Sequence, residues 1–411
     1  MLITTSLLKA VRVLIIATLT LLALLGSFVA TVYATTNPIN RSAISAITGI
    51  DAFAARPPIH ILAGSSVGPR GLTPTDVKTA YHLPYTGGTG TIAIISAYHH
   101  ASIASDLSNF SAEFLLPNCS TKSKCLEIHS MGTSAKTDSG WDLETALDTE
   151  WSHAIAPLAK ILVVEAKSTS GTDLMKAVDY AAKRSDAVSV SMSWGGGEFP
   201  GETKLDSHFS SNTSPNSTHR HLAFFASSGD DGAGASWPAI SPNVIAVGGT
   251  SLTMSHIKNL LPSFVSEKAW TGSGGGVSAY ENEPAYQVDY SIPRSNSKRA
   301  IPDVSYAADP DHGFSVYHSS SHSTNPKTIA TSKNWYVIGG TSAGAPQWAA
   351  IQALGSGVTL SALYSDKSSV ANSSYFRDIV SGKNGSCVYY CEARRRYDYV
   401  TGLGSPVTFM F

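Results

Sequence analysis

Apolar residues occur along this chain in short continuous runs, which alternate with segments where apolar residues recur every three or four positions. Continuous runs are typical of strands buried on both faces of a sheet, and the second pattern is typical of helices. Strands are predicted at residues 91–95, 160–165, 187–192, 221–225, 244–247 and 335–338, and helices through 106–114 and over 142–155, 173–183 and 347–354. The alternation predicts an α/β fold with a mostly parallel central sheet and helices on both faces.

The first part of the chain has a different pattern. In residues 1–34, Lys9 and Arg12 precede a long uncharged run from 13 to 34. This arrangement predicts a signal peptide. A membrane anchor that uses residues 13–34 is the alternative, because the run is long enough to span a bilayer.

Residues 35–70 show no clear periodicity and contain Arg56-Pro57-Pro58, so they are predicted to be a linker or a short pro-segment. The folded domain is predicted to cover residues 71–411. Near its start, Thr73 precedes Pro74 and is placed to cap a short helix.

Charge and cysteine content narrow the class of protein. The formal net charge of the 411-residue chain is −1, so no basic surface is expected and no nucleic-acid partner. Cysteines form two close pairs, Cys119 with Cys125 and Cys387 with Cys391, without a neighbouring histidine cluster. Two short disulfide loops are therefore expected rather than a zinc site, although four cysteines allow three connectivities. Disulfides suit a protein that is secreted, or anchored with its folded domain outside the cell.

The segment 339–346, Gly-Gly-Thr-Ser-Ala-Gly-Ala-Pro, holds the strongest candidate for chemistry. It joins a predicted strand to a predicted helix, so Ser342 lies at or next to the helix N-cap. Unpaired N–H groups and the positive end of the helix dipole favour a developing oxyanion there. An isolated serine at this place is usually a cap. Here the whole octet fits the pattern around the nucleophile of subtilisin-like peptidases, which makes Ser342 a candidate nucleophile.

A histidine base of the subtilisin type is not evident. Ser96 stands where an aspartate should follow the first strand, and His312-Gly313 lies in a predicted loop. Glu144 and Asp148 are four residues apart on a predicted helix and share one face. On a half-buried face two such carboxyls share a proton, which suits a general base acting on Ser342 in acid. A solvated helix face is the structural alternative.

From about residue 70 to 411 the chain resembles the sedolisins, which are serine-carboxyl peptidases related to subtilisin-like peptidases. The resemblance implies that Ser342 is the nucleophile, that Glu144 is its base and that Asp148 is the partner of Glu144. It also implies that Asp230, in the Ser-Gly-Asp-Asp-Gly turn 228–232, helps to form the oxyanion hole. A carboxyl that donates to an oxyanion must be protonated, so a low working pH is expected.

The same resemblance implies a substrate-lining edge at Ser193, Trp194 and Gly195, at the end of a predicted strand. Backbone groups there are expected to pair with an extended peptide, and Trp194 is expected to flank a side-chain pocket. The alternative for Trp194 is a core residue that closes the strand.

The tail resembles the calcium loop of the family, which implies one structural Ca²⁺ ion. Carboxylates of Asp378 and Asp398 and the backbone carbonyls of Ile379, Arg394 and Arg396 are the expected ligands. The family usually has Gly-x-Gly just before the second aspartate, where this chain has three arginines. Arginine resists left-handed backbone angles and adds positive charge beside a cation.

Together these features predict a monomeric, acid-acting endopeptidase that hydrolyses peptides or proteins through an acyl-enzyme on Ser342. One alternative is a catalytically inactive surface or binding protein with the sedolisin fold. Another is an acid hydrolase that uses Glu144 and Asp148 alone, as glycosidases use two carboxylates. Adjacent turns of one helix are poorly placed to flank a glycosidic bond, which disfavours this last reading.

Overall fold

The structure is a computed structural model, and it describes residues 49–132, 136–210, 222–319, 334–365 and 375–410. These residues belong to one compact unit, Gly49–Phe411. The expected signal peptide or anchor, residues 1–34, lies outside the described residues. Within the described part of the chain, no helix is both long enough and apolar enough to cross a membrane.

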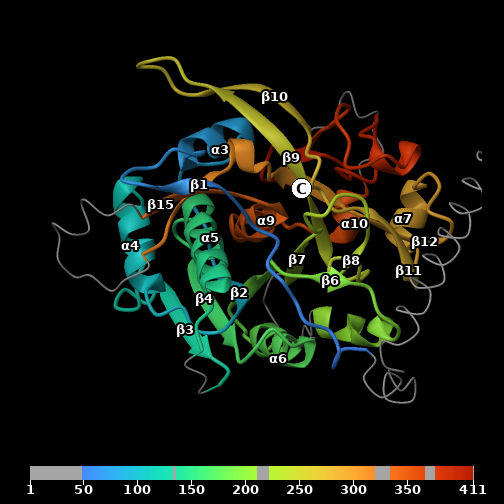
Figure 1. Cartoon of the computed structure of the whole chain (residues 1–411), viewed down its shortest axis with the longest axis horizontal. Helices are drawn as coiled ribbons and strands as arrows, with labels where there is room; N and C mark the ends of the chain where they lie inside the picture. The colour runs from blue at the N-terminus through green and yellow to red at the C-terminus, as the bar shows by residue number, and fades with distance from the viewer. Residues whose placement is uncertain (1–48, 133–135, 211–221, 320–333, 366–374, 411) are drawn as a thin grey trace, which may run out of the picture. The chain divides into compact units, whose positions relative to one another are not determined.

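A central sheet organises this unit (Figure 1). Its strands lie in the order β10-β9-β7-β5-β2-β4-β3, and β13 pairs with β9. The strands are β2 Thr91–Ala97, β3 Leu126–Ser130, β4 Lys160–Ala166, β5 Ala187–Met192, β7 Ala223–Ser227, β9 Ile245–Ser255, β10 Ser263–Ala269 and β13 Val304–Ala307. Every pairing in this sheet is parallel except that of β10 with β9. The predicted α/β fold with a mostly parallel sheet is therefore confirmed.

Helices cover both faces of this sheet. The helices of the described residues are α3 Pro74–Ala80, α4 Ile103–Glu113, α5 Ser139–Ile155, α6 Gly171–Ala182, α7 Ala285–Tyr290, α9 Gly344–Ala353 and α10 Leu360–Leu363. Helices α5 and α9 contact β2, and α6 contacts β2, β4 and β5. Because alternate residues of a strand point to opposite faces, Phe225 packs in the core cluster of α5 and α9 and Phe224 in that of α6. Thr73 caps α3 with a reciprocal capping box, as expected.

A smaller antiparallel sheet contains β1 His60–Ser66, β14 Phe314–Tyr317 and β15 Trp335–Gly339, in the order β1-β15-β14. The predicted strand 335–338 is thus present, but it lies outside the central sheet. Pairing of β1 with β15 brings residues before 71 into the fold. The compact unit begins at Gly49, well before the predicted start at Gly71.

Short elements and two disulfides complete the unit. The short strands and 3-10 helices are β6 Gly196–Gly197, β8 Ser236–Trp237, β11 Gly276–Asn282, β12 Lys298–Ile301, β16 Phe376–Arg377, β17 Ser405–Pro406, η1 Glu202–Phe209, η2 Pro310–His312, η3 Thr341–Ala343 and η5 Val388–Cys391. Disulfides join Cys119 to Cys125 and Cys387 to Cys391. Each closes a short loop, which is the pairing expected from the sequence.

Candidate active site

Helix α5 places Glu144 and Asp148 inside the molecule. Its apolar residues Leu143, Leu147 and Trp151 are buried against the sheet, which fixes the rotation of the helix. Glu144 and Asp148 are each only 1% exposed. The solvated-face alternative for these two carboxyls is therefore wrong, and their burial requires a chemical reason.

Ser342 lies in η3, the short turn between β15 and α9, and its side chain is fully buried. The turn is possible because Gly340 adopts a φ of 121°, a left-handed angle that suits glycine. Neither the Ser342 hydroxyl nor either Glu144 carboxylate oxygen has a hydrogen-bond partner within the described residues. The hydroxyl is nevertheless close enough to lower the pKa of Glu144. A hydroxyl and a carboxylate that are adjacent, buried and otherwise unpaired form a potential nucleophile–base pair.

Burial and mutual repulsion dominate the electrostatics of the two carboxyls on α5. Burial raises the pKa of Glu144 well above its ordinary value, and the neighbouring charge of Asp148 raises it further. Burial likewise raises the pKa of Asp148. At least one proton is therefore held between them at a pH where isolated carboxyls would both be ionised.

Ser193 connects this pair to the nucleophile turn. Its hydroxyl donates to Asp148 Oδ1 at 2.8 Å and lies 3.2 Å from the carbonyl oxygen of Ser342. The hydrogen bond from Ser193 opposes the rise in the Asp148 pKa. The side chain of Ser193 is buried, so its contacts are with the catalytic candidates. Its expected place on the substrate edge did not indicate this contact.

Asp230 follows the carboxyl end of β7 and reaches the same turn. Its Oδ1 accepts hydrogen bonds from the backbone N–H of Thr341 at 2.8 Å and from the Thr341 hydroxyl at 2.7 Å. Its Oδ2 lies 3.3 Å from Nε2 of His60. Burial raises the pKa of Asp230, while His60 and Thr341 oppose the rise. A buried carboxyl with a raised pKa, in contact with the residue that precedes Ser342, is placed to carry a proton beside the candidate nucleophile.

The expected substrate-lining edge at Gly195 is paired with an extended segment of the chain itself. Arg56 N–H donates to the Gly195 carbonyl at 3.1 Å, and Gly195 N–H donates to the Arg56 carbonyl at 3.2 Å. On the other side, Ala55 N–H donates to the Thr169 carbonyl at 2.9 Å. Residues 54–60 therefore lie between two backbone segments, in the manner of a bound peptide.

This segment lines a cavity of about 600 Å³ together with Gly195 and Asp230. A Cβ atom at Gly340 would collide with the Pro58 carbonyl and with Asp230 Oδ2, so the Pro58 carbonyl, Asp230 and the nucleophile turn are in close contact. Sequence reasoning did not place His60 or residues 54–60 at the site. Pro57-Pro58 was a signal for extended backbone only.

Trp194 does not flank this cavity. Its side chain is fully buried, and its Nε1 donates to the Ile95 carbonyl at 3.1 Å. Trp194 packs with Trp237 in the core on the α6 side of the sheet. The alternative of a core tryptophan is thus what the structure shows, because the alternation of a strand turns this side chain away from Ser193 and Gly195.

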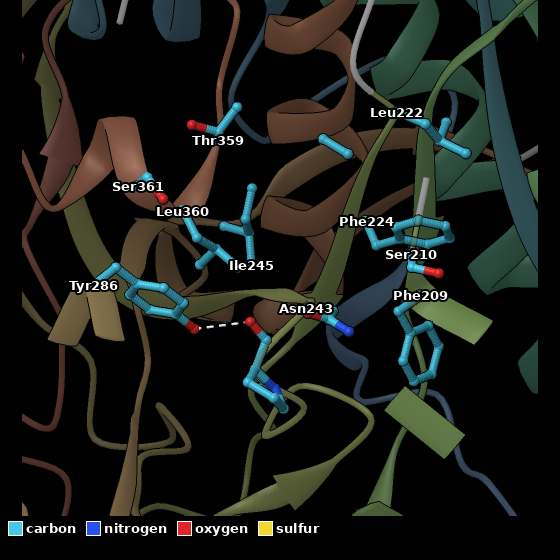
Figure 2. A pocket seen from close by; sticks show the side chains of 12 residues that line it. Phe209, Ser210, Leu222, Phe224, Asn243, Ile245, Tyr286, Thr359, Leu360 and Ser361 are labelled. Carbon is cyan, nitrogen blue, oxygen red and sulfur yellow. Dashed lines mark hydrogen bonds between the residues drawn. The ribbon is translucent and has the colours of Figure 1, made fainter. Parts of the chain in front are cut away.

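A second pocket lies at the opposite ends of the strands (Figure 2). It has a volume of about 360 Å³ and contacts the first residue of β7, Ala223, and of β9, Ile245, as well as α10. Tyr286 donates there to the Pro242 carbonyl at 2.9 Å. None of the described residues that line this pocket is charged. Open α/β sheets place their functional sites at the carboxyl ends of the strands, where Asp230 follows β7.

The expected calcium ligands are brought together in the tail. The N–H of Arg396 donates to Asp378 Oδ2 at 3.2 Å, and the N–H of Arg394 donates to Asp398 Oδ2 at 3.0 Å. Arg396 adopts a φ of 68°, the left-handed angle that glycine provides in the family pattern. Ile379, the fifth expected ligand, is buried beside them. Carboxylate and carbonyl oxygens form a donor set that fits Ca²⁺.

Comparisons with known proteins agree with this architecture. The subtilase family model matches residues 130–359. Sedolisin from Pseudomonas sp. (strain 101) is 26% identical, with 82% of this chain and 60% of that protein covered. Kumamolisin from Bacillus sp. (strain MN-32) is 29% identical, with coverages of 83% and 63%. The chain therefore spans less than two thirds of the length of these curated relatives.

A solved structure shows the same fold. Pseudomonas sedolisin, a serine-carboxyl proteinase complexed with two molecules of pseudo-iodotyrostatin, superimposes with a TM-score of 0.66 at 24% sequence identity. The match covers 83% of this chain and 96% of that one. Since the family model covers more than half of its residues, this chain belongs to the subtilase family, and it is of the sedolisin kind.

Proposed function

We propose that this protein is a secreted serine-carboxyl endopeptidase that acts in acid. The observation that carries the proposal is the proximity of Ser342 to Glu144: both side chains are buried, and the hydroxyl is close enough to lower the pKa of the carboxyl. The sedolisin-like fold and relatives support the class of reaction. Two disulfides suit an oxidising compartment outside the cytoplasm.

The reaction begins when Ser342 Oγ attacks the carbonyl carbon of a peptide bond and Glu144 takes the hydroxyl proton. Asp148, held by Ser193, orients Glu144 and shares its proton. The oxyanion of the tetrahedral intermediate is stabilised by protonated Asp230 and the backbone N–H of Ser342. Glu144 then protonates the departing amine, which leaves an ester on Ser342. Water, activated by Glu144, hydrolyses this ester.

Acid action follows from the carboxyl groups. Asp230 can donate to an oxyanion only while it is protonated, and burial raises its pKa so that it keeps its proton to higher pH. Glu144 must instead be ionised to accept a proton. Because burial and Asp148 raise the pKa of Glu144, its ionised form persists only above a raised threshold. Activity is expected in the pH range where Glu144 is ionised and Asp230 is not.

The substrate would be an extended peptide that replaces residues 54–60 along the edge at Gly195. This segment passes Asp230 and continues into β1, so the cleft accommodates a chain that extends in both directions. A cleft of this kind does not need a free chain end. Its geometry therefore favours cleavage within a protein rather than from a terminus.

We also propose one structural Ca²⁺ ion, held by Asp378, Asp398 and the carbonyls of Ile379, Arg394 and Arg396. When bound, the ion supplies positive charge and fixed coordination that tie these loop segments together. The hydrogen bonds from the Arg394 and Arg396 amides orient the two carboxylates for this role. No step of the peptidase reaction depends on the ion.

A peptide aldehyde tests the function directly. In acid, at the pH where cleavage is fastest, it should form a covalent hemiacetal with Ser342, seen as a mass increase on the peptide that contains this residue. Ser342→Ala should abolish both the adduct and cleavage of a denatured protein, and Glu144→Gln should lower kcat by about 10²–10⁴-fold. Ser361→Ala, in the pocket of Figure 2, serves as the control and should retain full activity.

The alternative is an inactive binding protein with this fold. It would be favoured if the aldehyde formed no adduct while labelled peptides still bound at the Gly195 edge. Full activity of either Ser342→Ala or Glu144→Gln would refute the assigned roles.

A further inference from the structure

The three consecutive arginines that depart from the family pattern line a separate cavity. It has a volume of about 610 Å³ and is lined by Arg394, Arg395 and Arg396 together with Tyr290, Tyr389 and Tyr397. Residues from the end of α7 and from η5 form its walls, and Ser342, Glu144 and Asp230 do not contribute to it. The proposed peptidase reaction does not use this cavity.

Its positive charge is only partly neutralised. Among the described residues, Arg394 is the member of the triplet with an ion pair, in which its Nη2 lies 2.6 Å from Glu392. The Nε of Arg394 is buried and has no hydrogen-bond partner among the described residues. Arg395 and Arg396 are exposed, and no carboxylate of the described chain forms an ion pair with either. Their guanidinium groups are therefore available to a ligand.

A fourth arginine adds to the charge. The guanidinium groups of Arg294 and Arg394 lie 3.8 Å and 4.7 Å from the centre of the Tyr389 ring. Four carboxylates lie around this region: Asp289 lines the cavity, Glu392 pairs with Arg394, and Asp378 and Asp398 accept the N–H groups of Arg396 and Arg394. Four arginines thus face four carboxylates, but Arg395 and Arg396 are exposed and form no ion pair with a described carboxylate, so the cavity presents unpaired positive charge.

The backbone conformation of Arg396 suggests a role for its side chain. Arg396 has a φ of 68°, which glycine would adopt without steric cost. A role for its side chain, which points charge toward solvent at a tyrosine-lined cavity, accounts for the residue.

We propose that this cavity binds a ligand that carries a sulfate or phosphate group on a ring. Guanidinium groups donate paired N–H bonds to tetrahedral oxyanions, which suits Arg395 and Arg396. Tyr290 and Tyr389 are partly exposed and offer ring edges against which a sugar or aromatic ring packs. The site holds the ligand without changing it, and it does so independently of the peptidase centre.

Isothermal titration of the full chain tests this proposal. The probes are 4-nitrophenyl sulfate, 4-nitrophenyl phosphate, inorganic sulfate and uncharged 4-nitrophenol, at constant ionic strength and without free phosphate in the buffer. One of the two charged aryl esters should bind with one site per chain, more tightly than inorganic sulfate or 4-nitrophenol. Whichever ester binds more tightly identifies the anion.

Arg395→Ala removes a guanidinium without altering an expected calcium ligand, and it should weaken that binding about tenfold. Tyr389→Leu should weaken binding of the aryl ester but not of inorganic sulfate. The control is Lys258→Ala, which removes the same charge from the exposed tip between β9 and β10 and should bind the ester as the parent does. Unfolding temperatures of the variants establish that each is folded.

Three results would overturn the proposal. Binding by Arg395→Ala equal to that of the parent would exclude the cavity, and equal losses in Lys258→Ala and Arg395→Ala would show a non-specific charge effect. Absence of binding by both aryl esters at millimolar concentration would exclude the ligand class. Peptidase activity of Arg395→Ala should be unchanged. A failure of the proposed anion site can therefore be distinguished from a failure of the proposed peptidase function.

Discussion

The imidazole Nε2 of His60 lies 3.3 Å from the carboxylate Oδ2 of Asp230, and the contact joins the segment 54–60 to the candidate oxyanion site. The hydrogen bond to Asp230 raises the pKa of His60, and burial raises the pKa of Asp230. Protonated His60 stabilises the fold through this contact. That stabilisation is fully present below the ordinary histidine pKa of 6.5, and it is lost as the pH rises through the raised pKa of the folded state. In acid, Asp230 becomes protonated, and His60 then has no negative charge to attract it. The attraction is thus strongest between the two raised pKa values.

His60→Ala should loosen the segment over that pH window. Amide hydrogen exchange at Ala55 and Arg56 is expected to become about two- to threefold faster near pH 6, a modest effect because His60 is half exposed. The difference should vanish near about pH 3, where Asp230 is protonated. Exchange is measured by mass spectrometry in a Ser342→Ala background, so that cleavage does not interfere. His82→Ala, another exposed histidine, is the control, and equal exchange in both variants at pH 6 would contradict the prediction.

Ser193→Ala should change the pH dependence of catalysis. Its hydroxyl holds Asp148 and opposes the rise in the Asp148 pKa. Without it the carboxyl pair should keep its proton to higher pH, so the acidic limb of the kcat profile should move to higher pH. The maximum rate is expected to fall about tenfold. Ser193→Thr should restore the profile, because threonine keeps the hydroxyl.

The matched control for this prediction is Ser189→Ala on the same strand. The Ser189 hydroxyl donates to the Ala349 carbonyl and does not contact Asp148. Its loss should lower stability without displacing the acidic limb. If both variants displaced that limb equally, Ser193 would have only a structural role.

Acid should stabilise the fold through Glu202 and Glu281. Burial raises the pKa of Glu202 to about 8 and that of Glu281 to about 7. A carboxyl with a raised folded pKa stabilises the fold below its ordinary pKa, and this contribution is lost as the pH rises through the folded value. The unfolding temperature is therefore expected to fall by about 2–5 °C between pH 4.5 and 8. Glu202→Gln should flatten this dependence, whereas Glu113→Gln, on an exposed helix surface, should leave it intact.

Differential scanning calorimetry between pH 4.5 and 8 measures these unfolding temperatures. An unfolding temperature that rises steadily from pH 4.5 to 8 in the parent chain would show that these carboxyls are paired with charge rather than buried without it.

Calcium should stabilise the tail. With the ion at about one hundred times its dissociation constant, the gain in unfolding free energy is about 2.7 kcal/mol, which a chelator should remove. Asp378→Asn should abolish the calcium-dependent rise in unfolding temperature. Asp289→Asn, which neutralises a nearby carboxylate outside the expected ligand set, should retain it. An unfolding temperature that is the same with calcium and with chelator would exclude the ion.

Much of the site could be predicted because its signals are local. The spacing of Glu144 and Asp148, the turn around Ser342 and the turn around Asp230 are each short patterns tied to a predicted helix or strand. Burial of Leu143, Leu147 and Trp151 agrees with the stripe that those residues form along α5. The sequence does not decide which way the Trp194 side chain faces, because a strand end does not reveal which face is buried. The contact of Ser193 with Asp148 could not be predicted from a local pattern, because it joins residues 45 positions apart.

The amino-acid sequence alone was enough to establish the α/β class and most strands and helices of the central sheet, and to predict the four residues of the candidate centre. These features depend on periodicity and on motifs of a few residues, and both can be recognised within a short stretch of sequence. The three-dimensional fold was needed to show that β15 leaves the central sheet, that residues 54–60 run through the cleft, and that His60 meets Asp230. Such contacts join segments more than a hundred residues apart, so they arise from packing and backbone pairing across the whole unit.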